Sequence, residues 1–199
     1  MKSYRVRVTV AVGMAVAGLA LSACGPVQAG AAAIVGGERI SSSDVDAKVR
    51  EFRADLASHK IPEEQLNLGM SVSQLILYNT ANARQYAELA RRKGVTVTES
   101  EIDGFVTQNG GQAKMDEMLL SSGIPLSMGR DTLRTVLIQQ KLMMQAGAGN
   151  DQQSRQAAMI KVGQEADAAV PVSFSPRYGK FDPQQGFVAD DRLGAVPSE

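Results

Sequence analysis

The sequence predicts a mainly α-helical bundle of about five to six helices with a minimal two-stranded β element. Apolar residues make up 44% of the chain and come mostly from Ala, Leu, Val and Met, whereas aromatic residues make up 5% and Trp is absent. This mixture favours packed helices over a β-sandwich. Several segments also join a helix-capping residue to apolar residues at helical spacing. Since the chain has a single cysteine, no internal disulfide can form, and the apolar core must stabilise the fold.

Residues 1–23 are predicted to be an export signal that takes no part in the fold. Lys2, Arg5 and Arg7 make a positively charged start, and residues 8–21 form an uncharged, mostly apolar stretch. This stretch is too short to span a bilayer comfortably, and no later segment approaches a membrane span. Any attachment to a membrane therefore has to come from another feature of the chain.

The apolar stretch ends in Leu21-Ser22-Ala23-Cys24-Gly25. This run resembles the lipobox of bacterial lipoproteins, in which the bond before the cysteine is cut and the new amino-terminal cysteine carries a diacylglycerol. The resemblance implies a lipid on Cys24, with Leu21, Ser22 and Ala23 as the lipobox, and a protein anchored at the extracytoplasmic face of the cell membrane. The alternative is an ordinary secretory signal cut after Ala23, which would leave Cys24 as an unusual free thiol on a secreted chain.

The remaining sequence is long enough for one domain with short ends. We expect a tether at residues 24–30, a helical domain at residues 31–182 and a flexible tail at residues 183–199. Three of the 21 basic residues lie in the export signal, so the mature chain has a net charge of about −3. This balance excludes nucleic acid as an expected partner, because such proteins carry a basic surface.

The domain is predicted to begin with a strand and a helix. The apolar residues 31–35 form the strand, which ends at Gly36-Gly37. Ser41 then caps a helix that extends to His59. Its apolar residues at helical spacing are Val45, Val49, Phe52 and Leu56.

Further capped helices follow. One runs from about Ser71 to Lys93, and Gly94 suits the left-handed conformation that ends it. Thr98 and Glu101 form a capping box for the next helix. The predicted buried face of the long helix consists of Val72, Leu75, Ile76, Ala83, Tyr86 and Ala90.

Residues 126–145 are predicted to form the central helix of the bundle, because apolar residues lie on two of its sides. A turn and a weaker helix at residues 152–169 follow. Residues 170–174 are strand-like and are expected to pair with residues 31–35. The main apolar line of the central helix is Leu126, Leu133, Leu137 and Met144.

Four motifs, in order, resemble the amino-terminal chaperone domain of the SurA family. Residues 35–40, VGGERI, are similar to its opening VNG-x-x-I, and residues 92–102, RKGVTVTESEI, to its KKGI-x-VS-x-x-E-(V/I) turn. Residues 132–142, TLRTVLIQQKL, are similar to its LR-x-x-L-(L/I)-x-x-K-L helix. Residues 175–182, SPRYGKFD, look like the NPRYG-x-(W/F)-D ending of its lipoprotein members. The resemblance implies an extracytoplasmic chaperone of unfolded secreted chains, related to the SurA and PrsA foldases.

The sequence departs from the enzymatic members of that family in one respect. Between Met144 and Gln152 it has only a short turn, where those members carry a parvulin-type prolyl isomerase domain. Parvulin sites usually contain histidines, and the single histidine here, His59, lies on the first helix. We therefore expect client binding without catalysis and without a cofactor.

Methionine is frequent between residues 115 and 159. Its flexible side chain suits surfaces that accept many apolar partners, so Met115, Met118 and Met143 are candidates for a client-binding groove. The alternative, which we favour, is that these residues fill an irregular core. The groove hypothesis holds if Met115 and Met118 face solvent or a cleft, and it fails if both are packed inside the bundle.

The other polar candidates have structural explanations. His59 is expected to pack or to interact with the end of its helix, and one histidine with a lipidated cysteine makes no metal site. Glu99, Glu101 and Asp103 lie in a first helical turn, where the helix dipole stabilises negative charge. For Arg177, Tyr178 and Phe181, closure of the bundle end is favoured over functional contacts.

These observations lead to three functional hypotheses. The first is a lipid-anchored, extracytoplasmic holdase for unfolded or translocating secreted proteins. The alternative is an assembly lipoprotein that holds one specific partner at the cell envelope. A prolyl isomerase comes last.

Overall fold

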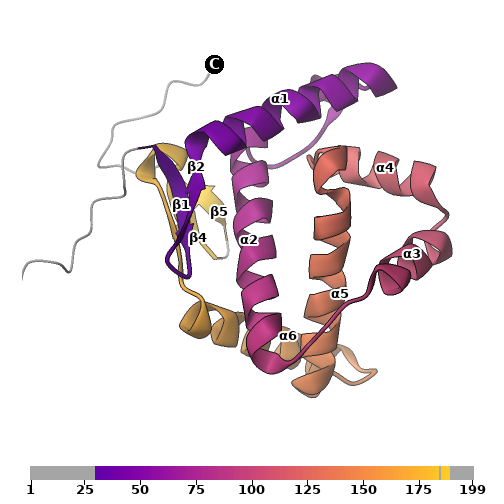
Figure 1. Ribbon diagram of the computed structural model, residues 1–199, viewed down its shortest axis with the longest axis vertical. Helices are drawn as coiled ribbons and strands as arrows, with labels where there is room; N and C mark the ends of the chain where they lie inside the picture. The colour runs from indigo at the N-terminus through magenta and orange to yellow at the C-terminus, as the bar shows by residue number, and fades with distance from the viewer. Residues whose placement is uncertain (1–29, 184, 189–199) are drawn as a thin grey trace, which may run out of the picture.

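The computed structural model describes residues 30–183 and 185–188 (Figure 1). These residues form a helical bundle with two small antiparallel sheets, which confirms the mainly α class. The helices are α1 (Ser42–His59), α2 (Val72–Lys93), α3 (Glu99–Gln108), α4 (Gln112–Ser121), α5 (Gly129–Gln145) and α6 (Gln152–Ala169), with short 3-10 helices η1 (Glu63–Gln65), η2 (Leu126–Met128) and η3 (Pro176–Tyr178). The strands are β1 (Ala31–Val35), β2 (Glu38–Ser41), β3 (Val172–Phe174), β4 (Lys180–Asp182) and β5 (Gly186–Val188).

The first sheet joins the beginning of the domain to its end. Its strand order is β2-β1-β3, and Ala33 of β1 pairs with Phe174 of β3, so the predicted pairing of the two segments is confirmed. The β part is larger than predicted, because the turn at Gly36-Gly37 adds β2 and because β4 pairs with β5. β5 lies inside the predicted flexible tail, and the rest of that tail, from residue 189, lies outside the described residues.

The predicted helix caps are confirmed. Ser41 Oγ accepts a hydrogen bond from the backbone N–H of Asp44 at 3.1 Å. Thr98 forms the predicted capping box with Glu101, and Ser71 forms a further one with Gln74 that was not predicted. These bonds satisfy backbone donors that the first turn of a helix leaves unpaired.

Two helices, α2 and α5, organise the bundle. α2 packs against β1, α1, α5 and α6, and in Figure 1 it runs between the sheets and α5. α5 packs against α2, α3 and α6, as expected of a central helix. Met144, the last residue of the apolar line predicted for this helix, was wrongly expected to be buried, because it is 64% exposed. The residues that α5 buries are Gly129, Leu133, Thr135, Ile138 and Leu142.

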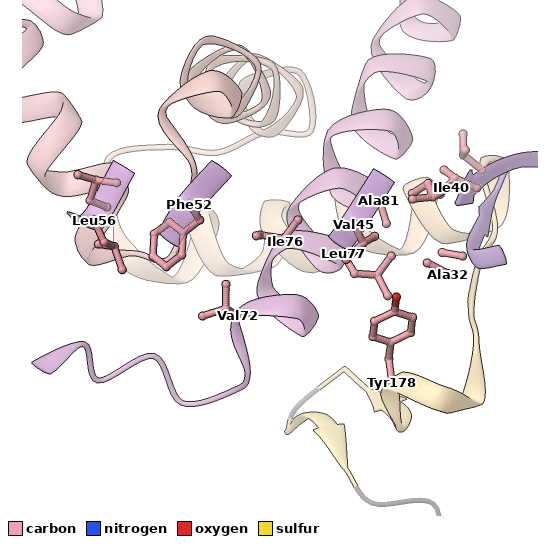
Figure 2. Close-up of a cluster of buried hydrophobic side chains, with 14 residues drawn as sticks. Ala32, Ile40, Val45, Phe52, Leu56, Val72, Ile76, Leu77, Ala81 and Tyr178 are labelled. Carbon is pink, nitrogen blue, oxygen red and sulfur yellow. The ribbon is translucent and has the colours of Figure 1, made fainter. Parts of the chain in front are cut away.

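The largest hydrophobic cluster lies between β1, α1 and α2, and Tyr178 completes it (Figure 2). Phe52 and Leu77 are fully buried there. The Tyr178 ring is also buried, and its hydroxyl points toward Leu77. Tyr178 therefore has the structural role expected for it, at the closed end of the bundle.

Candidate functional site

A groove lies between α2, α6 and the segment that contains β3 and β4. Its volume is about 410 Å³. Tyr78, Asn82 and Tyr86 of α2 are spaced by four residues, so they line one wall along a single helix face. The remaining lining residues are Ala81, Gln85, Gly163, Asp167, Pro171, Val172, Phe174, Phe181 and Pro183.

Aromatic rings form the sheet side of the groove. The Phe181 ring stacks on Tyr78 at a centroid distance of 5.5 Å and lies 5.1 Å from Phe174. Phe187 of β5 contacts Phe174 and Phe181 edge-on, at 5.0 and 5.3 Å. All four rings are only partly buried, so they hold one another in place and still offer apolar surface.

A buried amide ties the polar side of the groove together. Gln85 Nε2 donates to Asp167 Oδ1 at 3.0 Å and to the Val170 carbonyl oxygen at 3.0 Å. These two bonds link α2 to the end of α6 and to the chain that enters β3. Because Gln85 is buried, loss of either acceptor would leave a polar group unpaired in the protein interior.

Asp167 gives the groove its charge. Its side chain is exposed, and it is the one side chain of the groove lining that is charged at physiological pH. Burial raises the pKa of Tyr78, and the negative charge of Asp167 raises it further. Burial is also the main cause of the raised pKa of Tyr86, to which Asp167 contributes as well. Both phenols therefore stay neutral at physiological pH, beside a carboxylate.

Gly163 keeps the α6 side of the groove open. Outside its own helix and chain neighbours, no heavy atom lies within 4 Å of the place where a Cβ would stand. Met159 and Ile160 lie one turn earlier on the same side of α6, and they are 58% and 51% exposed. The apolar surface of the groove therefore continues onto this part of α6.

The three candidate methionines, Met115, Met118 and Met143, do not lie together on one surface. Met115 is fully buried in a cluster with residues of α3 and α5, which contradicts a surface role, whereas Met118 is 46% exposed. Met143 packs against a different cluster, between α2, α5 and α6. Met115 points into the core because it shares one side of α4 with Leu119, which is four residues later and is buried in the same cluster. The predicted lipid site, Cys24 with Leu21, Ser22 and Ala23, lies outside the described residues.

The other predicted polar residues have structural partners. His59 Nδ1 lies 2.9 Å from the Asp55 carbonyl oxygen in the last turn of α1, so its helix-end role is confirmed, although the side chain is exposed. Arg130 pairs with Glu99 and with Asp103 and thereby joins α5 to α3. Glu101 pairs with Lys141 at 2.5 Å. Within residues 30–183 and 185–188, no group of three or more His, Cys, Asp or Glu side chains is arranged to hold a metal ion.

Of the three carboxy-terminal candidates, one lines the groove. Phe181 is part of its aromatic side, whereas Tyr178 is buried and the Arg177 guanidinium lies 5.3 Å from the centroid of the Tyr178 ring. Sequence reasoning missed Tyr78, Gly163 and Asp167. The spacing of Tyr78, Asn82 and Tyr86 was the signal for an aromatic helix face, but nothing local indicated that α6 and β4 lie opposite it.

Comparison with known proteins found one family. A family model described as the SurA-like N-terminal domain matches residues 2–143. No curated protein and no solved structure matches the chain. The match includes α2, which forms one wall of the groove, and ends before α6 and the strands that form the other side. None of the described helices combines the length and apolar character needed to cross a membrane.

Proposed function

Because the chain belongs to the SurA-like N-terminal domain family, we propose that it is a holdase that binds unfolded or translocating secreted proteins in the groove described above. The family is of chaperone type, which supports binding of non-native chains as the general role. The aromatic groove between α2, α6 and β4 is the observation that carries the more specific proposal.

The chemistry of the groove suits clients of varied sequence. Partly exposed aromatic rings offer large apolar faces that accept many side chains, and they lose little conformational entropy on binding because they already pack against one another. A volume of about 410 Å³ accommodates a few side chains of an extended segment. Met159 and Ile160 add adaptable apolar surface beside it.

We propose that this role needs no catalysis and no cofactor. The single histidine of the chain lies at the end of α1 and not in the groove. The phenols that line the groove with Asp167, those of Tyr78 and Tyr86, have raised pKa values and stay protonated, which makes them poor nucleophiles and bases. Binding and release of apolar segments therefore suffice for the proposed activity.

We further propose that a lipid on Cys24 holds the domain at the extracytoplasmic face of the cell membrane. The support is the sequence of residues 21–25 after a charged start and an apolar stretch. Six residues, 25–30, separate Cys24 from β1, and the seven steps from Cys24 to Ala31 reach at most about 25 Å when extended, so the domain would stay close to the bilayer. A Cys24→Ser variant should lose labelling by a fatty-acid analogue and leave the membrane fraction; unchanged labelling would exclude this site.

The groove is tested by closing it without disturbing the fold. Gly163→Arg places a long polar side chain in the groove, and replacement of a helical glycine favours the helix. Gly104→Arg in α3 is the matched control, because that glycine also has open space at its Cβ position but lies away from the groove.

The readout is the aggregation of two unrelated, chemically denatured proteins with the purified chain at stoichiometric amounts. The wild-type chain and Gly104→Arg should suppress aggregation of both, and Gly163→Arg should suppress it much less. Equal suppression by the two variants would place client binding elsewhere. No suppression by the wild-type chain would favour the alternative, an assembly lipoprotein for one specific partner.

A further inference from the structure

The charge of Asp167 has no counterpart within the part of the chain that the structure describes. Its oxygen Oδ1 accepts from the neutral amide of Gln85, and no described Lys or Arg forms an ion pair with it. Two cations at the end of α2 contact the α6 region at other groups: Lys93 pairs with Glu165 at 2.7 Å, and Arg92 donates to the Ala169 carbonyl oxygen at 2.6 Å. An exposed carboxylate with a free oxygen therefore faces whatever enters the groove.

The surroundings of Asp167 suit a cation. Tyr78, Tyr86, Phe174 and Phe181 line the same groove, and the faces of such rings attract ammonium and guanidinium groups. The amide oxygen of Asn82 adds another acceptor on the α2 wall. A carboxylate, aromatic faces and an amide in one groove together favour a positively charged side chain over a neutral or negative one.

We propose that the groove selects client segments in which a Lys or Arg lies next to apolar residues, with the cation at Asp167 and the apolar side chains on the aromatic rings. This inference rests on the proposed function and adds a charge preference to it. The complementary charge commits the site to basic, apolar peptides and disfavours apolar segments flanked by Asp or Glu.

The test compares two peptides and two variants. The probes are fluorescent Ser/Gly-rich peptides with a central Leu-Phe-Lys or a central Leu-Phe-Gln, and binding to the purified chain is followed by fluorescence anisotropy. Asp167→Asn removes the charge but keeps an oxygen that accepts the Gln85 hydrogen bond, so the fold is retained. Asp116→Asn is the matched control, because Asp116 of α4 lies outside the groove, where it accepts from Gln112.

The wild-type chain should bind the Lys peptide about fivefold more tightly than the Gln peptide, as expected for one partly exposed ion pair with cation–π contacts. High salt should reduce this preference. Asp167→Asn should bind the Lys and Gln peptides equally, with its affinity for the Gln peptide unchanged from that of the wild-type chain. Asp116→Asn should keep the preference for the Lys peptide.

Equal affinities of the wild-type chain for both peptides would overturn the charge selection, but would remain consistent with binding of apolar segments in the groove. A preference that survives in Asp167→Asn would also overturn it, because the cation would then bind elsewhere. Absence of binding for both peptides would contradict the proposed function itself, and the charge selection with it.

Discussion

Tyr178 contributes to the core through its ring and not through its hydroxyl. The ring is buried beside Leu77 and Ala32, whereas the hydroxyl oxygen is buried without a hydrogen-bond partner among the described residues. A buried polar group that lacks a partner destabilises the folded state. Tyr178→Phe should therefore leave the melting temperature unchanged or raise it.

Removal of the whole ring should have the opposite effect. Tyr178→Ala leaves a cavity in the largest cluster and should lower the free energy of unfolding by about 3–5 kcal/mol. Chemical denaturation of both variants measures these changes. A Phe variant as unstable as the Ala variant would show that the hydroxyl has a partner after all.

Glu101 links the start of α3 to α5, and it makes the fold sensitive to acid. The ion pair with Lys141, and then the hydrogen bond from the Thr98 backbone, lower the pKa of Glu101 from 4.5 to about 2. Since the pKa is lower in the folded state, the carboxylate stabilises the fold fully above about pH 4.5, and this contribution is lost as the pH falls toward 2.

The melting temperature of Glu101→Gln should therefore fall less than that of the wild-type chain between pH 4.5 and pH 2. The matched control is Glu117→Gln, at an exposed residue of α4 that forms no ion pair in the described part of the chain. It should follow the wild-type curve. If the melting temperatures of all three proteins fell in parallel with pH, Glu101 would not be a source of the acid sensitivity.

Individual site residues were predictable only where their chemistry is local. The cap at Thr98 follows from the sequence because its partner, Glu101, is three residues away. Asp167 and Tyr78 lie far apart in the sequence, so the site that they share becomes visible only in the folded chain. Met115 and Met118 are three residues apart, yet one is buried and the other exposed, and composition could not separate them.

At the scale of elements, the bounds of the helices were predicted better than their buried faces. Caps, glycines and helical spacing located α2 and α6 closely. Val72, Ile76 and Ala90 of the predicted α2 face are buried, whereas Leu75, Ala83 and Tyr86 are only partly buried. The helix also buries four residues that were not predicted, Leu77, Ala81, Gln85 and Leu89. The reason is that α2 has neighbours on several sides, so the packing of α6 and β1 decides which face is covered.

The strand β3 and the β4–β5 hairpin should stabilise the whole domain. β3 pairs with β1, and the backbone N–H of Ser175 donates to the Ala32 carbonyl oxygen at 2.8 Å. A chain that ends at Ala169 loses this strand, Tyr178 and the aromatic side of the groove, so its melting temperature should fall clearly. A chain that ends at Val188 keeps every described contact and is the matched control. Equal melting curves for the two truncated chains would contradict this role of β3.

At the scale of the whole molecule, the groove depends on closure of the fold. Its α2 wall belongs to the part that matches the family model, whereas Gly163, Asp167 and Phe181 come from the segment after it. The pairing of β1 with β3 brings these segments together. The part that matches the family model therefore supplies one wall of the groove, and the carboxy-terminal segment completes the site that we propose for client binding.

The most direct test of this account is site-specific photocrosslinking to a denatured client. Benzoylphenylalanine would replace Asn82, which lines the groove, and in a second protein Gln108, which is exposed at the end of α3. The account predicts that a chemically denatured protein crosslinks to the probe at position 82 and much less to the probe at position 108. Equal crosslinking at both positions, or crosslinking at position 108 alone, would contradict the groove as the client-binding site.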